Sequence, residues 1–351
     1  MANKITIKDI AREAGVSLGS VHLALADKAG VSDSTRQRIK EIAQRLDYKP
    51  NILASNLKRE TRTVAVALPK RDAKSRFYHD YMWNAIADAE AMAKELNLQI
   101  LKLEYTNLPE TLYQIDLSEI SGLITVGYPE EDYDEAIHRV TDAGIPTILV
   151  DNDMPESGRM SCLQPDTQSI GELTGELLLD MIHRIDGKIL VCGGSRKYPN
   201  HYRIVDAVSE YLEAAHVKDR VLKVYLEDVD QDGGAYLEQL LRDEQVCGCC
   251  SVNSRTTKTL AEALLNSGKA HYIPAIGNGL FRESAQYLKD GVLTALIDKR
   301  PYEQCYRAFH TMADLLAKAI QPAGAVMYVG ADVVFRSNLS QYDKVSFRMI
   351  R

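Results

Sequence analysis

The chain has 351 residues, 45% of them hydrophobic and 26% charged, with a formal net charge of −7. These values are those of a soluble globular protein with room for two or three compact domains. They exclude a membrane-spanning chain, because no apolar run approaches the ~20 residues that a span requires. The first residues, MANKITIKDI, also lack the apolar region of a secretory signal, so we expect a cytoplasmic protein.

Charge is distributed unevenly along the chain. Residues 1–62 hold 12 lysines and arginines against 7 acidic residues, a net charge of +5. The remaining residues hold 30 against 42, a net charge of −12. A basic head on an acidic body indicates that only the head meets a polyanion, although a solvated basic face is a simpler alternative.

The head is predicted to contain three short helices. Thr6 caps the first, with Asp9 placed as its capping-box partner, and Ser32 or Ser34 caps the third. The predicted helices span residues 6–14, 17–26 and 32–46. Their apolar positions form one small core of Ile10, Ala11, Ala14, Val21, Leu25, Ile39, Ile42, Ala43 and Leu46.

The stretch GVSLGSVHLAL, residues 15–25, has the pattern of the turn and second helix of a helix-turn-helix, with Ser17 as the cap. Val21, Ala24 and Leu25 form its buried stripe. The residues left outside this stripe are Leu18, Gly19, His22 and Leu23. This face has no Arg, Lys, Asn or Gln, so we expect it to meet DNA through shape, methyl contacts and the imidazole of His22.

A fourth helical stretch, NILASNLKRE, follows Pro50, with Asn51 as its expected cap. It has little apolar surface, so alone it should be frayed.

From Thr63 onward, short β-rich runs alternate with helical periods. The predicted strands are TVAVAL, LQILKLEY, GLITVG, PTILVD, KILVCG, VCGCCSV, YIPAIG and TALID. The predicted helices between them include residues 81–96, 169–184, 202–215 and 258–267. Repeated β-α units imply parallel sheets with helices on both faces, and we expect two α/β lobes with a cleft between them.

Three of the six cysteines, Cys247, Cys249 and Cys250, lie in VCGCCSV. Their spacing is not that of a zinc site, and no histidine is close. We expect a buried parallel strand in which cysteine acts as a small hydrophobic residue, with metal or redox chemistry as the alternative. We therefore expect no metal and no cofactor.

The head resembles the lactose repressor (LacI) family. The segments TIKDIAREAGVSLGSVHLAL, VSDSTRQRIKEIAQRLDYKPN and NILASNL are similar to its DNA-binding domain and hinge helix. The body, with RPYEQCYRA, resembles the periplasmic-binding-protein-like effector domain of that family. The expected fold is thus α/β, with an all-α helix-turn-helix head and a two-lobed parallel α/β body.

The resemblance implies a division of the chain. Residues 1–60 would form the DNA-binding domain, with the hinge helix at about 51–59, and residues 63–351 the effector domain. The first lobe would comprise about 63–160 and 291–322, and the second about 161–290 and 323–343.

The resemblance also implies the residues that bind double-stranded DNA. Thr6, Ile7, Ser17 and Ser20 would grip phosphates. Leu57 would wedge a base step apart in the minor groove, although a lone leucine on a polar helix could also be plain surface. The full expected set is Thr6, Ile7, Ser17, Leu18, Gly19, Ser20, His22, Leu23, Asn51, Ala54, Leu57 and Lys58. His22 and Leu23 stand where the family usually has Ser-Arg, so the operators of relatives do not transfer.

A small-molecule effector is implied in the cleft, with the expected ligands Phe77, Tyr78, Asp151, Arg203, Asn253, Asn278 and Lys299. Core packing is the alternative for one of the two aromatics. The usual family residues are an Asp at Asn278 or Gly279 and a Gln at Lys299. With Arg196 and Lys197 nearby, this gain of positive charge favours a sugar acid or a phosphorylated sugar over a neutral sugar, unless Lys299 points to solvent.

The resemblance predicts a homodimeric repressor of carbohydrate genes that binds a near-palindromic operator and is controlled by a sugar-like effector. The C-terminal segment has no leucine heptads for a tetramer. The alternatives are a secreted solute-binding protein, which would lack the head, and a sugar-processing enzyme. The chain has none of G-x-x-x-x-G-K-[ST], G-x-S-x-G or H-E-x-x-H.

Overall fold

The computed structural model describes residues 5–25, 27–46, 48, 60–71, 76–182, 185–229 and 232–342, with side chains from residue 78 onward in the segment that starts at 76. The chain divides into two compact units, a helical head up to Thr61 and an α/β body from Arg62. No helix in these ranges combines the length and the apolar character that a membrane crossing needs.

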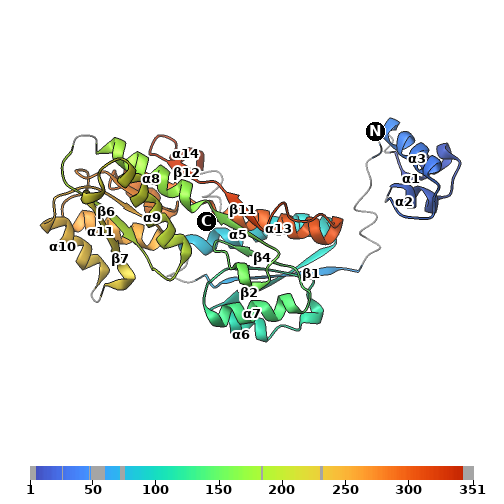
Figure 1. Ribbon diagram of the computed structural model, residues 1–351, viewed down its shortest axis with the longest axis horizontal. Helices are drawn as coiled ribbons and strands as arrows, with labels where there is room; N and C mark the ends of the chain where they lie inside the picture. The colour runs from blue at the N-terminus through green and yellow to red at the C-terminus, as the bar shows by residue number, and fades with distance from the viewer. Residues whose placement is uncertain are drawn as a thin grey trace. The chain divides into compact units, whose positions relative to one another are not determined.

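The head contains the three expected helices, α1 (Ile7–Ala14), α2 (Leu18–Leu25) and α3 (Asp33–Arg45) (Figure 1). α1 begins where the backbone N–H and the hydroxyl of Thr6 both donate to the Asp9 carboxylate, at 2.9 and 2.7 Å. It ends at Gly15, whose φ of 65° is a left-handed conformation that glycine adopts without strain. The Ser17 hydroxyl then accepts the Ser20 N–H at 3.0 Å and caps α2.

The three helices bury one shared core, Ile10, Ala11, Ala14, Val21, Ala24, Ile39, Ile42 and Ala43. Leu25 and Leu46, expected in this core, are only half-buried at its edge. The Arg36 guanidinium ties α3 to the end of α2, because it donates to the carbonyls of Leu23 at 3.3 Å and Lys28 at 2.7 Å. The predicted hinge helix, with Asn51, Ala54, Leu57 and Lys58, lies outside the described residues.

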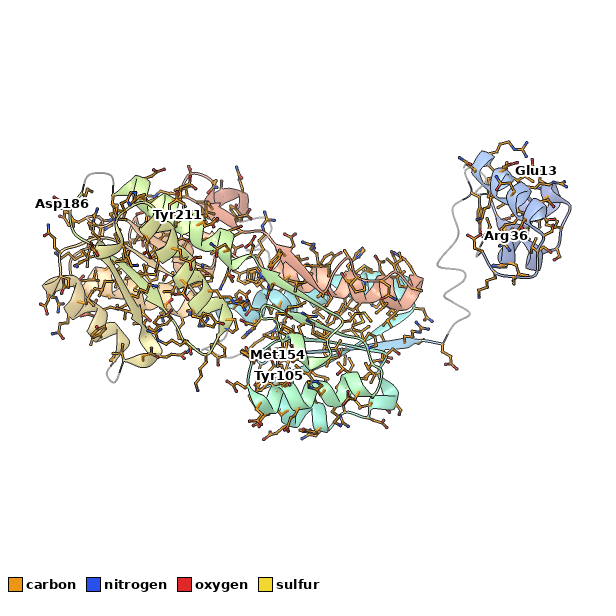
Figure 2. The ribbon with its side chains drawn as sticks, viewed as in Figure 1. Glu13, Arg36, Tyr105, Met154, Asp186 and Tyr211 are labelled. Carbon is orange, nitrogen blue, oxygen red and sulfur yellow. The ribbon has the colours of Figure 1, made fainter. Side chains whose placement is uncertain are left out.

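The first lobe of the body is built on a six-stranded sheet with the order β11-β5-β4-β3-β1-β2, all of it parallel. Its strands are β1 (Arg62–Pro69), β2 (Leu98–Tyr105), β3 (Gly122–Val126), β4 (Thr147–Val150), β5 (Ser161–Pro165) and β11 (Val326–Val329). Its helices are α5 (Arg76–Glu95), α6 (Leu108–Tyr113), α7 (Glu131–Asp142) and α13 (Pro301–Lys318). α6 and α7 cover one face and α5 and α13 the other (Figure 1). Tyr105 and Met154 lie in the core on the α6–α7 side (Figure 2).

The second lobe has the sheet order β12-β10-β9-β8-β6-β7, parallel except for β12. Its strands are β6 (Lys188–Gly193), β7 (Val221–Tyr225), β8 (Val246–Ser251), β9 (Ala275–Asn278), β10 (Ala295–Asp298) and β12 (Asp332–Val334). Its helices are α8 (Thr167–Met181), α9 (Pro199–Ala214), α10 (Gly233–Asp243), α11 (Ser254–Asn266), α12 (Arg282–Lys289) and α14 (Leu339–Tyr342). One core lies under α8 and α9, and a second under α10, α11 and α12.

Strand pairing corrects the expected lobe boundaries. Ser161–Pro165 pairs with β4 and Val326–Val329 pairs with β5, so both belong to the first lobe. Ala295–Asp298 pairs with β9 and belongs to the second. The boundaries were wrong at these strands because pairing between distant segments leaves no local signal in the sequence. The chain consequently crosses between the lobes three times, after β5, after β10 and after β11.

The cysteine-rich segment forms β8, which is buried along its whole length and parallel to both neighbours, as expected. Burial raises the pKa of the Cys250 thiol to about 12 and that of Cys249 further. These thiols therefore stay protonated and serve the core as small apolar side chains.

Candidate functional site

A cavity of about 430 Å³ opens between the two lobes, where strands of both sheets end. The first lobe contributes Tyr78, His79, Tyr128, Asp151 and Asn152 to its lining. The second lobe contributes Gly194, Tyr198, His201, Leu226, Glu227, Asp232, Gly233, Gly234, Asn253, Ser254, Arg255, Thr256 and Thr259, and Lys299 follows β10. Carboxyl ends of parallel strands are where open α/β sheets bind ligands, so this cavity is the candidate ligand site.

Four of the residues expected in the cleft line this cavity: Tyr78, Asp151, Asn253 and Lys299. Asp151, Asn253 and Lys299 lie within two residues of a strand end, whereas Tyr78 lies in the first turn of α5. Phe77 lies in α5 with its side chain outside the described ones.

Two expected ligands lie elsewhere. Arg203 is exposed and does not line the cavity, because α9 turns about 100° per residue and presents His201 there instead. Asn278 is 1% exposed at the end of β9, outside the cavity lining, and its backbone N–H and carbonyl bond to the Thr257 hydroxyl. Arg196 and Lys197 are also exposed and outside the lining.

Asp151 joins the two lobes. Its Oδ1 accepts the Tyr78 hydroxyl at 2.7 Å and Asn200 Nδ2 at 2.9 Å, and its Oδ2 accepts Asn152 Nδ2 at 2.9 Å. Asn200 belongs to α9 of the second lobe and also donates to the Asp151 carbonyl at 2.7 Å. Burial and the neighbouring carboxylate raise the pKa of Tyr78 well above its usual value, so its hydroxyl remains a donor.

Lys299 lies in the wall of the cavity, with 4% of its surface exposed, so the alternative that it points to solvent is wrong. Its Nζ is 3.4 Å from the Val252 carbonyl and 5.5 Å from the centre of the Tyr78 ring. Within the described chain it forms no ion pair. Burial lowers the pKa of Lys299, while the charges of Asp151 and Asp298 raise it.

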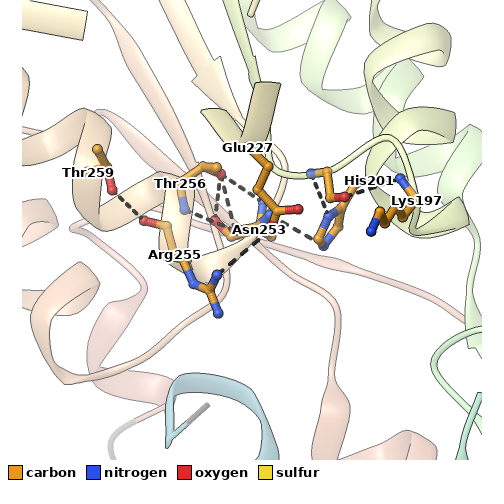
Figure 3. Close-up of polar contacts among 8 residues, drawn as sticks. Lys197, His201, Glu227, Asn253, Arg255, Thr256 and Thr259 are labelled. Carbon is orange, nitrogen blue, oxygen red and sulfur yellow. Dashed lines mark hydrogen bonds and ion pairs between the residues drawn. The ribbon is translucent and has the colours of Figure 1, made fainter. Parts of the chain in front are cut away.

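His201 is held in one orientation next to Asn253 (Figure 3). Its Nδ1 accepts the Ser195 N–H at 3.1 Å, and its Nε2 lies 3.3 Å from Asn253 Nδ2. Burial, together with the positive charges of Lys299 and Arg255, lowers the pKa of His201 to about 3. The ring is therefore neutral near pH 7, and its proton resides on Nε2 because Nδ1 is an acceptor.

Asn253 is the N-cap of α11, and its Oδ1 accepts the Thr256 N–H at 2.9 Å. The loop after β6 passes so close that a Cβ on Gly194 would lie 2.1 Å from Asn253 Nδ2 and 2.9 Å from His201 Nδ1. Glycine at this position is thus a requirement of the wall that presents the two side chains.

Sequence reasoning missed several lining residues. Arg255 follows Asn253 closely and lies 3.8 Å from Glu227 (Figure 3). Tyr128 of the first lobe meets Tyr198 of the second, with ring centres 5.7 Å apart. Their signal was available, since each lies within five residues of a predicted strand end.

Several of the residues expected to contact DNA are exposed on the head. Thr6, Ser17, Gly19 and His22 are exposed, and Leu18 is 43% exposed. The remaining expected contacts, Ile7, Ser20 and Leu23, are half-buried at the edge of this face. The exposed end of α2 thus offers small, apolar and imidazole groups, in agreement with the pattern of the sequence.

Comparisons with known proteins match both parts of the chain. Residues 75–320 match the periplasmic binding protein domain family, and residues 6–51 match the lacI family of bacterial regulatory proteins. Catabolite control protein A of Streptococcus mutans is 25% identical over 70% of this chain and 74% of its own. The ribose operon repressor of Lactococcus lactis is 28% identical over 69% of this chain and 65% of its own. The regulator DegA of Bacillus subtilis is 30% identical, over 43% of this chain and 45% of its own.

Solved structures share the fold of the body. A LacI-type transcriptional regulator of Bacteroides fragilis superposes with a TM-score of 0.71 at 18% identity, over 81% of this chain and all of the other. A solute-binding protein of Agrobacterium vitis with bound tagatopyranose gives 0.67 at 17% identity, over 82% of this chain and 98% of the other. These likenesses concern the architecture of the two lobes.

Proposed function

Because the chain belongs to the LacI family of bacterial regulators, with a periplasmic-binding-protein-like body, we propose that it represses carbohydrate uptake or catabolism genes under the control of a sugar-derived effector. It would act in the cytoplasm, where its operator DNA lies. The observation that carries the proposal is the combination of a basic helix-turn-helix head with a two-lobed body that encloses a polar cavity.

The DNA-binding part of the proposal rests on the head. A helix-turn-helix places its second helix in the major groove, and the N-terminal end of α2 carries the exposed Ser17, Leu18 and Gly19. Leu18 can contact thymine methyl groups, and His22 can donate to guanine N7 or O6. The residues of the hinge segment, above all Leu57, would then read the deformability of the operator centre.

The carbohydrate part rests on the cavity and on the relatives. Two similar regulators are named for catabolite control and for the ribose operon, and one structural neighbour holds a tagatopyranose. The cavity combines hydroxyl, amide and carboxylate groups with the aromatic rings of Tyr78, Tyr128 and Tyr198. Such a mixture binds hydroxylated ligands through hydrogen bonds and stacking on ring faces.

Coupling between the two parts requires a dimer. Two heads would span a near-palindromic operator, and a change in lobe closure would alter the spacing of the hinge segments and thereby the DNA affinity. In this scheme, the effector can either release the DNA or promote DNA binding.

An operator selection tests the proposal. The full-length protein is incubated with duplexes that carry a random central region, and bound sequences are amplified over several rounds. We expect a near-palindromic site that binds roughly a thousandfold tighter than a scrambled duplex at physiological salt. Equal affinity for both duplexes would contradict a sequence-specific regulator.

A further inference from the structure

The side of the cavity formed by the second lobe holds a buried cation, Lys299, on which Asp151 and Asp298 act at a distance but which forms no ion pair within the described residues. Lys299 is 4% exposed, and among the described residues its three N–H donors have one acceptor, the Val252 carbonyl at the long distance of 3.4 Å. No carboxylate of the described chain pairs with it. A buried ammonium normally has a charged partner, because its desolvation is otherwise costly. A partner is therefore expected from the ligand.

Two further donors converge beside this cation. His201 carries its proton on Nε2, since its Nδ1 accepts the Ser195 N–H. That Nε2 faces Asn253 Nδ2 at 3.3 Å, and the amide cannot turn around, because its Oδ1 already accepts the Thr256 N–H. Two N–H donors thus face each other without an acceptor between them. An oxygen entering the cavity there would accept from both.

Besides Lys299, the described lining holds three carboxylates, Asp151, Glu227 and Asp232, and one further cation, Arg255, and this balance disfavours a ligand with two negative charges. Asp151 is occupied by Tyr78 and Asn200, and Asp232 caps α10 through Gly234 N–H at 2.8 Å. Glu227 lies 3.8 Å from Arg255 and offsets that cation. Lys299 is thus the only cation of the described lining without an ion-pair partner, and the carboxylates of Asp151 and Asp232, which accept from neutral donors, would repel a phosphate dianion more strongly than a single carboxylate.

We infer that the effector is a hydroxylated carboxylic acid of the sugar-acid class, with its carboxylate bound by Lys299, His201 and Asn253. The inference rests on the proposed function for the identity of the cavity as the effector site. Asp151 and the tyrosines would then face the hydroxylated part of the same molecule.

Calorimetric titration of the full-length protein tests this inference with matched ligands. The panel contains D-gluconate, D-glucuronate and D-galacturonate, the neutral sugars glucose and galactose, and the 6-phosphates of both sugars. We expect at least one carboxylate to bind about 10- to 100-fold tighter than its neutral parent, as a charge-assisted contact provides. We expect Lys299→Met to remove that preference and Lys197→Met, at an exposed position outside the cavity, to retain it.

Three results would overturn the inference: a neutral sugar or a phosphate binding tightest, no carboxylate binding below 10 mM, or equal carboxylate affinity in Lys299→Met. Lys299→Gln, which keeps a polar group without the charge, gives the same comparison if the methionine variant does not fold. Operator affinity of each variant is measured in parallel. If the wild type binds its operator but shows no carboxylate preference, the ligand class alone is refuted. If the wild type does not bind an operator, the proposed function is refuted.

Discussion

The surroundings of His201 fix its charge state in the wall of the cavity. Its ring is enclosed by the β6–α9 loop and Asn253, and two cations, Lys299 and Arg255, act on it. A third positive charge at this place would be unfavourable, so the folded protein keeps the imidazole neutral down to acidic pH. The neutral ring supplies one donor and one acceptor in fixed directions, which suits a recognition site better than a mobile charge.

This environment predicts a pH dependence of stability. The pKa of His201 is about 3 in the folded chain and near 6.5 when unfolded. Between these values the unfolded chain binds a proton that the folded chain does not, so the free energy of unfolding should decrease as the pH falls from about 6.5. Urea unfolding of wild type and His201→Gln at pH 7 and pH 4.5 should show a smaller loss in the variant. His216→Gln, at an exposed histidine, should behave as wild type; equal losses in all three proteins would refute the buried neutral ring.

Among the elements, the loop from β6 to α9 sets the geometry of the cavity wall. It passes within contact distance of α11, and a side chain at Gly194 would have to displace both Asn253 and His201. The sequence pattern predicted the strand and the helix, but not this close approach between segments about 60 residues apart. Tertiary packing, rather than a local backbone preference, thus requires the glycine.

Gly194→Ala should therefore destabilise the body by about 1–3 kcal/mol, the usual effect of overpacking. It should also weaken effector binding, because Asn253 and His201 must shift. Gly330→Ala is the matched control, since nothing lies within 4 Å of the position that its Cβ would take. Denaturant unfolding measures the stability of both variants. A Gly194→Ala protein as stable as the Gly330→Ala control would show that Asn253 and His201 can shift without cost.

The exposed face of α2 predicts how operator binding responds to substitutions in the head and in the hinge segment. This face offers His22 as a polar reader of bases, whereas an inserted Leu57 would unstack a central base step in each operator. We expect Leu57→Ala to weaken operator binding more than His22→Ala, which should cost no more than the ~1–3 kcal/mol of a good base contact. Fluorescence titrations on one selected operator compare them. A larger loss in the His22 variant would show that α2 reads bases directly.

The extent to which the sequence predicts the molecule depends on how local each signal is. Helix caps such as Thr6 and Ser17 and the buried strand around Cys249 were predicted correctly, because their patterns lie within a few residues. Ligand candidates directly after strands, such as Asp151, were also found. Arg203 was wrong by two positions on a helix, where each residue changes the facing direction by about 100°. Lobe membership failed at three strands, because it is decided by pairing across the chain.

For the whole molecule, the separation of charge predicts how operator binding responds to salt. The head region of residues 1–62 has a net charge of +5 and the rest −12, so DNA contacts concentrate on the head. Neutralising phosphates releases counterions, and affinity should fall steeply, by orders of magnitude, between about 50 and 200 mM salt. Anisotropy titrations across this range provide the slope. A nearly flat response would contradict phosphate-dominated binding by the head.

The two lobes, with the cavity between them, are connected by hydrogen bonds and by the chain itself. Asn200 of α9 bonds to Asp151 after β4, and three crossings of the chain connect the sheets. A ligand that contacts both walls shifts the equilibrium between two lobe arrangements. The size of the shift equals the difference between its binding free energies for the two arrangements. We expect this difference in ligand affinity between the lobe arrangements to change the affinity for the operator.

The coupling is best measured in both directions on the full-length protein. The affinity of the selected operator is determined with and without the tightest ligand of the calorimetric panel, and the affinity of that ligand with and without the operator. We expect the same factor in both experiments, of about 5 to 150, in whichever direction the ligand acts. A factor of one in both, with ligand and operator each binding well, would show that the cavity and the DNA-binding head act independently.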